Sequence, residues 1–198
     1  MKKKNIVLIG AGGHAVSCID VIESTKKFKI IGLIDDKKIK YLKLGKKIYK
    51  IFNEKNFLKG KIRNNALISI GSNKFSVKRK SLYQKYKKLG FKFPVITSPH
   101  SYISKFSKIG EGSIIMHGAI INSNVNIGTN CIINSKSLIE HDCTVGDNTH
   151  IATSANINGY VVIEKNCFIG SNTTITPSTR IKKNSFIKAG KLIKKNYG

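Results

Sequence analysis

The chain has 198 residues, of which 36 are lysine or arginine and 10 are acidic, giving a formal net charge of +26. Hydrophobic residues make up 40% of it, which suits a folded protein and excludes wholesale disorder. No apolar run is long enough to span a membrane, and the four cysteines show no spacing that would indicate a disulfide framework. The length suits one large domain or two small ones.

Nearly all of the basic residues are lysines; the only arginines are Arg63, Arg79 and Arg180. Proteins that grip nucleic acid usually rely on arginine for bidentate contacts. We therefore interpret the charge as compositional and expect no nucleic-acid partner, although a non-catalytic polycation that binds nucleic acid stays open as an alternative. The charge would also attract anionic small molecules.

The amino terminus is similar to a signal peptide, because lysines 2–4 precede an apolar run over 6–9. That run stops at Gly10, and His14 falls inside the segment that would have to be apolar. We therefore expect a cytoplasmic protein with no membrane association.

Strand and helix patterns alternate over residues 1–99. Apolar runs predict strands at 5–9, 29–34, 66–70 and 91–96, and helical patterns follow the first run and cover 74–89. This alternation predicts an α/β domain with a small parallel sheet, about half the size of a full dinucleotide-binding fold.

The first predicted strand ends in a glycine-rich turn, Gly10-Ala11-Gly12-Gly13-His14-Ala15, which fits the dinucleotide pattern GxGxxA. Glycines let a phosphate approach the backbone closely, in front of a helix dipole. Asp35 follows at the end of the second predicted strand. Because the domain is small, a mononucleotide or nucleotide sugar fits it better than NAD, and a purely structural turn is the alternative.

The second half of the chain repeats every six residues. From Ile103 to Ile193, every sixth residue is isoleucine or valine, without an insertion. In an α-helix, side chains six residues apart would be scattered around the circumference. Small residues and turn-forming residues recur at fixed places between them. Each hexad therefore predicts a short strand and a corner, and three hexads one triangular coil. Residues 100–198 are predicted to form a left-handed parallel β-helix, with Cys131, Cys143 and Cys167 in its core.

One outward column of this repeat is apolar: it reads Ile114, Ile132, His150, Phe168, Phe186. Such a column is unsuited to solvent. We expect copies of the chain to cover it around a threefold axis, which predicts a homotrimer.

The GAGGHA turn, the pair Asp35-Asp36 and an uninterrupted hexapeptide helix that contains Glu140-His141-Asp142-Cys143 together resemble one family over nearly the whole chain. This family comprises the bacterial nucleotide-sugar acetyltransferases with hexapeptide repeats. It includes the sialic acid O-acetyltransferase type and the UDP-4-amino-sugar N-acetyltransferases. The resemblance implies an acyltransferase that uses acetyl-CoA and no metal. Its expected acceptor is the amino group of a nucleotide-linked 4-amino-4,6-dideoxy sugar, with UDP as the expected nucleotide, in glycan biosynthesis.

The resemblance also implies roles for residues. His141 matches the general base for direct attack, and Asp142 would hold its imidazole in the correct tautomer. The residues that would contact acetyl-CoA are His150, Ala152, Gly159, Gly170, Ala189 and Gly190, the Gly159 amide being a candidate oxyanion donor. The residues that would contact the nucleotide sugar are Gly10, Gly12, Gly13, His14, Asp35, Asp36, Lys37 and Asn134.

The repeat adds a geometric constraint on this site. It places His141 at a corner between two faces and His150 on the third face, on the order of 15 Å away within one prism. The two histidines can share a site only if two chains contribute, so we expect the site at a trimer interface.

Three other functions stay open. O-acetylation of sialic acid would use the same base on a hydroxyl, and a GDP-linked amino sugar such as perosamine could replace the UDP-linked one. A metal-dependent hydratase on the same solenoid would need three histidine ligands, for which His117, His141 and His150 are candidates.

The end of the chain departs from the family, which usually carries a Gly-x-Pro-Ala type turn that helps to clamp CoA. Lysines could contact the CoA phosphates instead; the candidates are Lys182, Lys183, Lys188, Lys194 and Lys195.

Overall fold

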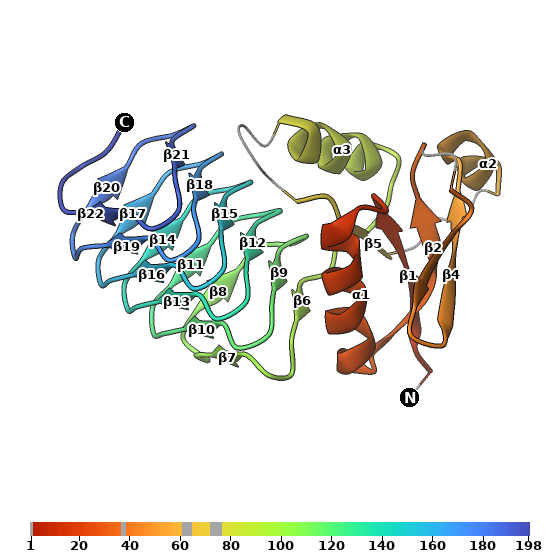
Figure 1. Cartoon of the computed structure of the whole chain (residues 1–198), viewed down its shortest axis with the longest axis horizontal. Coiled ribbons are helices and arrows are strands. Elements are labelled where there is room, and N and C mark those ends of the chain that lie inside the picture. Colours follow the sequence, from red (N-terminus) through yellow and green to blue (C-terminus); the bar gives the residue numbers. More distant parts are fainter. Residues whose placement is uncertain (1, 37–38, 61–64, 72–76) are drawn as a thin grey trace.

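The computed structural model describes residues 2–36, 39–60, 65–71 and 77–198. An α/β domain and a three-sided prism of short strands lie side by side, with helix α1 packed between them (Figure 1). The predicted architecture is confirmed: a parallel-sheet domain is followed by a left-handed β-helix.

The first domain is built on a sheet with the strand order β3-β4-β2-β1-β5. Its strands are β1 (Lys4–Ile9), β2 (Phe28–Ile34), β3 (Tyr41–Leu44), β4 (Lys47–Phe52) and β5 (Asn65–Ile68). All neighbours run parallel except β3, which pairs antiparallel with β4. The sequence analysis missed this hairpin and the short helix α2 (Glu54–Lys59) that follows it.

Two helices cover the sheet. Helix α1 (Gly13–Thr25) packs between one face of the sheet and the prism, and α3 (Val77–Lys88) contributes to the cluster on the other face (Figure 1). Of the basic helix predicted over 74–89, residues 74–76 lie outside the described part of the chain.

The strand predicted over 91–96 is wrong. Pro94 has no N–H to give to a strand ladder, and the segment makes only an isolated bridge, between Lys92 and Asn65. Phe91 and Phe93 instead pack edge-on against tyrosines of α3. The next strand, β6 (Ile96–Thr97), already belongs to the prism.

Sixteen further strands of two residues form the prism, and each ends at an aliphatic residue of the repeat. They are β7 (Tyr102–Ile103), β8 (Lys108–Ile109), β9 (Ile114–Ile115), β10 (Ile120–Ile121), β11 (Asn126–Ile127), β12 (Ile132–Ile133), β13 (Leu138–Ile139), β14 (Thr144–Val145), β15 (His150–Ile151), β16 (Asn156–Ile157), β17 (Val162–Ile163), β18 (Phe168–Ile169), β19 (Thr174–Ile175), β20 (Arg180–Ile181), β21 (Phe186–Ile187) and β22 (Leu192–Ile193).

These strands stack into three parallel sheets, one on each side of the prism. The β15 face contains β6, β9, β12, β15, β18 and β21. The β13 face contains β7, β10, β13, β16, β19 and β22, and the β14 face contains β8, β11, β14, β17 and β20. Partners in adjacent coils are always eighteen residues apart, as His150 and Phe168 are.

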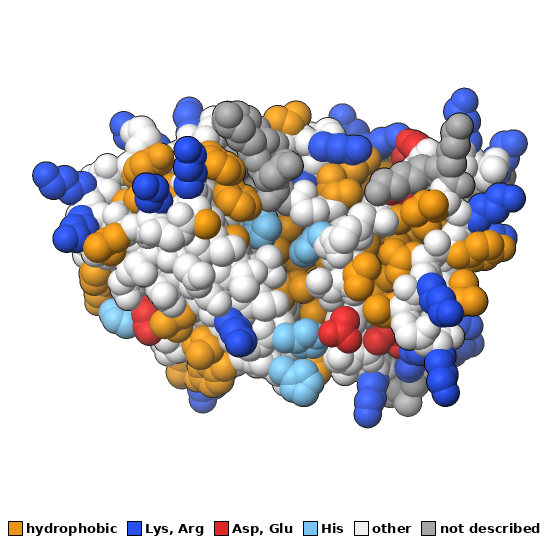
Figure 2. Space-filling model, in the orientation of Figure 1, with side chains coloured by type: hydrophobic (Ala, Val, Ile, Leu, Met, Phe, Trp, Pro, Cys, Tyr) orange, Lys and Arg blue, Asp and Glu red, His pale blue; other side chains and the backbone are white. Residues whose placement is uncertain are grey.

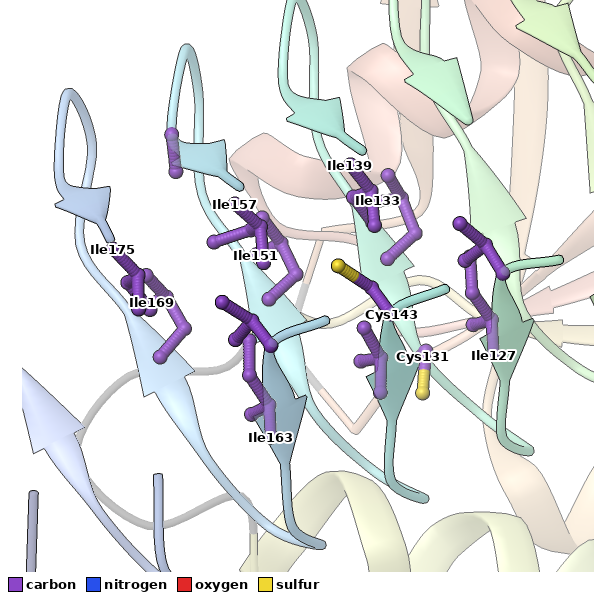
Figure 3. Close-up of a cluster of buried hydrophobic side chains, with 14 of the residues drawn as sticks. Ile127, Cys131, Ile133, Ile139, Cys143, Ile151, Ile157, Ile163, Ile169 and Ile175 are labelled. Carbon is purple, nitrogen blue, oxygen red and sulfur yellow. The ribbon is translucent and has the colours of Figure 1, made fainter. Parts of the chain in front are cut away.

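The prism core is the inward column of the repeat, stacked coil upon coil (Figure 3). Each buried isoleucine side chain contributes about 1.5–3 kcal/mol. Cys131 and Cys143 fill the same core, and burial raises the pKa of the Cys131 thiol to about 12. That thiol is therefore protonated at neutral pH and fills space.

Helix α1 covers part of the apolar column that was expected to lie between copies of the chain. Ile114 and Ile132 are fully buried in one cluster with Ile19 and Ile22 of α1. That part of the expectation was wrong, because the amino-terminal domain folds back on the β15 face of its own prism. None of the helices in the described ranges is both long and apolar enough to cross a membrane.

Substitutions at two neighbouring residues of β17 test whether the inward side chains contribute most of the free energy of unfolding. Ile163 is fully buried and Val162 points outward. We expect Ile163→Ala to lower the free energy of unfolding by about 2–5 kcal/mol and Val162→Ala by less than about 1 kcal/mol, measured by urea unfolding. Equal losses in the two variants would contradict this assignment of the core.

Candidate functional site

His141 lies at the corner between the β13 and β14 faces, directly after β13, and its side chain is 52% exposed. Its Nδ1 lies 2.8 Å from Oδ2 of Asp142. Because a carboxylate only accepts hydrogen bonds, Nδ1 carries the proton and donates it. Nε2 is then the basic nitrogen, and it has no hydrogen-bond partner among the described residues.

Three residues from adjacent coils surround this pair. Asn124 Nδ2 donates to Asp142 Oδ1 at 3.2 Å. The imidazole lies over Gly159, where a Cβ would come within 2.9 Å of Nε2, and the Tyr160 ring meets it edge-on at 5.2 Å. The ring is therefore held through Nδ1 by Asp142 and packs against Gly159 and Tyr160, while the side chain stays half exposed.

The hydrogen bonds from His141 and Asn124 lower the pKa of Asp142, so this side chain stays a carboxylate. Asn124, Asp142 and Tyr160 all adopt φ near 60°, each at the same corner of successive coils. The sequence analysis missed Asn124 and Tyr160, although their spacing of eighteen residues from Asp142 places them in its column.

A second cluster forms where α1 meets the β15 face, and Figure 2 shows histidine side chains along this junction. The rings of His14 and His150 lie 6.4 Å apart. Nδ2 of Asn134 lies 3.3 Å from Nε2 of His150, and the Phe168 ring packs edge-on against His150. The structure thus brings together three of the predicted site residues, from both domains.

His14 is uncharged in this cluster. Burial lowers its pKa to about 3, with the charges of Arg79 and His150 acting in the same direction. Its Nε2 is buried and has no hydrogen-bond partner among the described residues.

The glycine-rich turn is fixed from two sides. Gly10 has φ 111°, and a Cβ there would lie 2.4 Å from the Ile70 side chain. Asp35 Oδ2 accepts a hydrogen bond from the Ala11 amide at 2.7 Å, so it holds the turn itself. A Cβ at Gly12 or Gly13 would meet no atom of the described residues within 4 Å, so these residues leave room in front of the start of α1.

A solvent-open pocket lies beside this turn, at the carboxyl ends of β1 and β2. The predicted residues Gly10, Asp35 and Asp36 line it. The sequence analysis missed three polar residues of its wall, Glu54, Lys78 and Tyr86. Lys37, predicted to contact the nucleotide, lies outside the described residues.

The residues predicted to contact acetyl-CoA fall at two different corners. Ala152, Gly170, Ala189 and Gly190 lie between the β15 and β13 faces, where Gly170 packs so closely that a Cβ would be 2.4 Å from the Ala189 amide. Gly159 lies with His141 at the other corner. Both corners border the β13 face.

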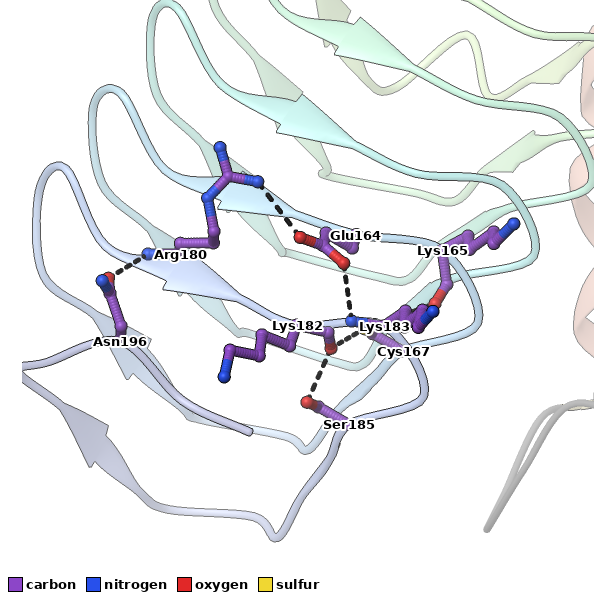
Figure 4. A network of polar contacts seen from close by, with 8 residues as sticks. All are labelled: Glu164, Lys165, Cys167, Arg180, Lys182, Lys183, Ser185 and Asn196. Atoms are coloured by element: carbon purple, nitrogen blue, oxygen red, sulfur yellow. Dashed lines mark hydrogen bonds and ion pairs between the residues drawn. The ribbon is translucent and has the colours of Figure 1, made fainter.

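The carboxyl-terminal lysines are spread over different sides of the prism. Lys182 and Lys183 lie at the corner between the β14 and β15 faces, in a network with Glu164 and Arg180 (Figure 4). Lys188 directly precedes Ala189 at the corner described above. Of the proposed lysines, the structure therefore brings Lys188 to the predicted CoA residues and keeps Lys182 and Lys183 away from them.

His117 serves the contact between domains. Its Nε2 lies 3.1 Å from Asp20 of α1 and its Nδ1 lies 2.6 Å from Ser98 Oγ. It does not converge with His141 and His150 within one chain. No group of three or more histidine, cysteine or acidic residues in the described ranges is placed to hold a metal ion.

Known domain families match most of the chain. Residues 5–86 match the PglD N-terminal domain. Residues 100–141 match the bacterial transferase hexapeptide (six repeats), and 160–195 match the hexapeptide repeat of succinyl-transferase. The chain joins a PglD N-terminal domain to a hexapeptide-repeat domain. The resemblance stated from the sequence is confirmed at this level.

Solved structures share this fold along its whole length. The acetyltransferase domain of PglB from Neisseria gonorrhoeae FA1090 is 21% identical, with a TM-score of 0.89 over 99% of this chain and 94% of that one. PerB from Caulobacter crescentus, in complex with CoA and GDP-perosamine, is 24% identical, with a TM-score of 0.87 over 98% and 90%. WeeI from Acinetobacter baumannii AYE is 25% identical, with a TM-score of 0.84 over 97% and 92%. No curated protein sequence matches the chain.

The buried, uncharged His14 predicts a pH dependence of stability. Its pKa is about 3 in the folded chain, against an ordinary value of 6.5, so between these pH values the unfolded chain binds more protons. Stability therefore rises with pH through this window and falls by about 3 kcal/mol from pH 6.5 to pH 4.

Urea unfolding at several pH values measures this loss. His14→Gln should remove most of it relative to the unaltered chain, while substitution of the exposed His100 by glutamine should leave it unchanged. An identical pH dependence in the His14 variant would contradict the assignment.

Proposed function

We propose that this protein is an acetyl-CoA-dependent N-acetyltransferase that acts on a nucleotide-linked 4-amino-4,6-dideoxy sugar. The observation that carries the proposal is the half-exposed His141–Asp142 pair, in which Nδ1 faces the carboxylate and Nε2 is left to accept a proton. Support comes from the PglB domain and from PerB, whose structures hold acetyl coenzyme A and CoA with GDP-perosamine respectively. In this proposal residues 1–99 bind the nucleotide sugar, and residues 100–198 carry acetyl-CoA and the base, in the cytoplasm.

The chemistry needs one base and one polarising group. The amine nitrogen attacks the thioester carbonyl, a C–N bond forms, and Nε2 of His141 takes the proton that the nitrogen loses. Asp142 stabilises the imidazolium that results. The C–S bond then breaks and CoA leaves as a thiolate, which takes up the proton that His141 removed. The Gly159 amide, which has no backbone partner among the described residues, stabilises the oxyanion formed at the carbonyl.

We further propose that the site is completed by a second chain, in a trimer whose β13 faces turn toward the threefold axis. The two corners that carry the predicted residues both border this face. In one chain it leaves Tyr102, Ile120 and Leu192 exposed, an apolar surface that a cyclic contact around the threefold axis would cover. The His141 corner of one chain then meets the corner of the next chain that carries Ala152 and Gly170, beside His150 of β15.

The proposal includes the nucleotide that carries the sugar. UDP is the expected nucleotide, and the likeness to PerB, in complex with GDP-perosamine, favours GDP as the second candidate. Thiol release from acetyl-CoA, followed over a panel of UDP- and GDP-linked 4-amino sugars and sialic acid, separates N-acetylation from O-acetylation. Absence of transfer to every amino sugar would overturn the proposal.

Substitution of the base tests the mechanism. We expect His141→Asn to lower kcat by about 10²–10⁴-fold, because it removes general-base catalysis, while the oligomer is retained. Asp142→Asn should cost less, because the imidazole keeps its place over Gly159. The measurement is steady-state thiol release, with light scattering as the control for assembly. Full activity in the His141 variant would remove the assigned base.

Mixing two inactive variants tests whether two chains share a site. His141→Ala and His150→Ala alter the two different parts of a chain that would face each other in the trimer, so hybrid trimers contain some interfaces in which both histidines are intact. We expect unfolding and refolding of the variants together to restore activity that neither variant has alone. Recovery should fail when two preparations of the same variant are mixed. A mixture that stays inactive, although native mass spectrometry detects hybrids, would contradict the shared site.

A further inference from the structure

Arg79 of α3 is only 1% exposed, in the space between the α/β domain and the prism. Its Nη1 donates to the carbonyls of Ile68 at 2.5 Å and Ile70 at 2.9 Å, at the carboxyl end of β5. Its Nε donates to the carbonyl of Asn130 at 3.2 Å, at a prism corner between β11 and β12. One planar guanidinium therefore joins the two domains.

This arginine is a costly residue to bury. Burial lowers its pKa to about 10, so it stays charged at neutral pH. No carboxylate in the described ranges pairs with it, and its Nη2 is buried without a hydrogen-bond partner. Hydrogen bonds to carbonyls alone do not offset the free-energy cost of removing this cation from water. Its burial therefore points to a role in the neighbouring site.

The end of β5, to which Arg79 donates hydrogen bonds, packs against the glycine-rich turn. The Ile70 side chain lies directly against Gly10, and Ser69 Oγ donates to the Gly10 carbonyl at 2.7 Å. On the same strand end, Gly71 faces His14, with 3.8 Å between a Cβ built there and the His14 Cβ. A shift of this strand end would move the turn and His14 with it.

We propose that Arg79 is a positioning residue, which locks the end of β5 onto the prism and so places the turn over residues 10–14 and the His14 imidazole for the nucleotide ligand. The inference rests on the proposed function for the identity of that ligand, but the contacts that carry it lie within one chain.

The charge of Arg79 adds a second effect on His14. Burial, then Arg79, then His150 keep the imidazole uncharged. The titratable and charged groups that act on His14 are thus Arg79 from α3 and His150 from β15, and Cys18 of α1 lies near Arg79. An uncharged His14 can give or accept one hydrogen bond at Nε2, whereas a charged one could only donate.

Two variants of Arg79 separate these effects, with the exposed Arg180 as a matched control. Arg79→Gln removes the charge and the planar fork, Arg79→Lys keeps the charge but cannot reach three carbonyls in the same plane, and Arg180→Gln changes a surface pair with Glu164. The first readout is titration of the His14 imidazole by NMR in the full chain without ligand. The second is the Kd of UDP and of GDP by calorimetry.

We expect Arg79→Gln to raise the pKa of His14 and to weaken nucleotide binding by about tenfold, roughly the loss of one hydrogen bond to a charged group. Arg79→Lys should leave the His14 titration unchanged but still weaken binding severalfold, and Arg180→Gln should change neither.

The proposal is overturned if Arg79→Gln behaves as Arg180→Gln does in both readouts. If Arg79→Gln does not fold, the test is Arg79→Lys. The proposal is overturned if this variant binds nucleotide as tightly as the unaltered chain does. If the unaltered chain binds neither nucleotide, the proposed function fails. The His14 titration then decides the inference by itself, and an unchanged pKa in Arg79→Gln overturns it.

Discussion

Every coil of the prism must place its inward aliphatic side chains on those of the coil before it, and the rest of the structure depends on this stacking. Because the coils are parallel and carry no insertion, residues eighteen apart always fall in one column. Asn124, Asp142 and Tyr160 therefore meet at a single corner, although they are far apart in the sequence. The geometry around His141 is a consequence of core packing, since the corner cannot move without the strands on either side of it.

His141 and His14 have opposite electrostatic surroundings. His141 stands half in solvent, with a carboxylate that orders its tautomer. His14 is buried beside a cation that no carboxylate in the described ranges neutralises. The same side chain is thus prepared to take a proton at one place and to stay neutral at the other, because solvent access and neighbouring charge decide which form is stable.

Contact between the domains buries apolar side chains that the prism by itself would expose to solvent. Helix α1 buries Ile114 and Ile132 on the β15 face, and Asp20 and Arg79 add polar contacts from the amino-terminal domain to the prism. The exposed aliphatic and aromatic side chains of the prism are then concentrated on the β13 face, between the two corners that carry the candidate residues. This is the face that the proposed trimer would bury.

The sequence alone determined the prism, its strands and the corner position of His141, since a period of six without insertion leaves no other register for the side chains. It also determined the glycine-rich turn, because a positive φ at Gly10 and close contact with Ile70 require glycine there. Only the tertiary structure decided which face α1 covers, that Arg79 joins β5 to the prism, and that Asp35 holds the turn. Two of these contacts join residues far apart in the sequence, Ala11 with Asp35 at 24 positions and Arg79 with Asn130 at 51. They depend on how the surfaces of the two domains fit, which no local pattern of residue types encodes.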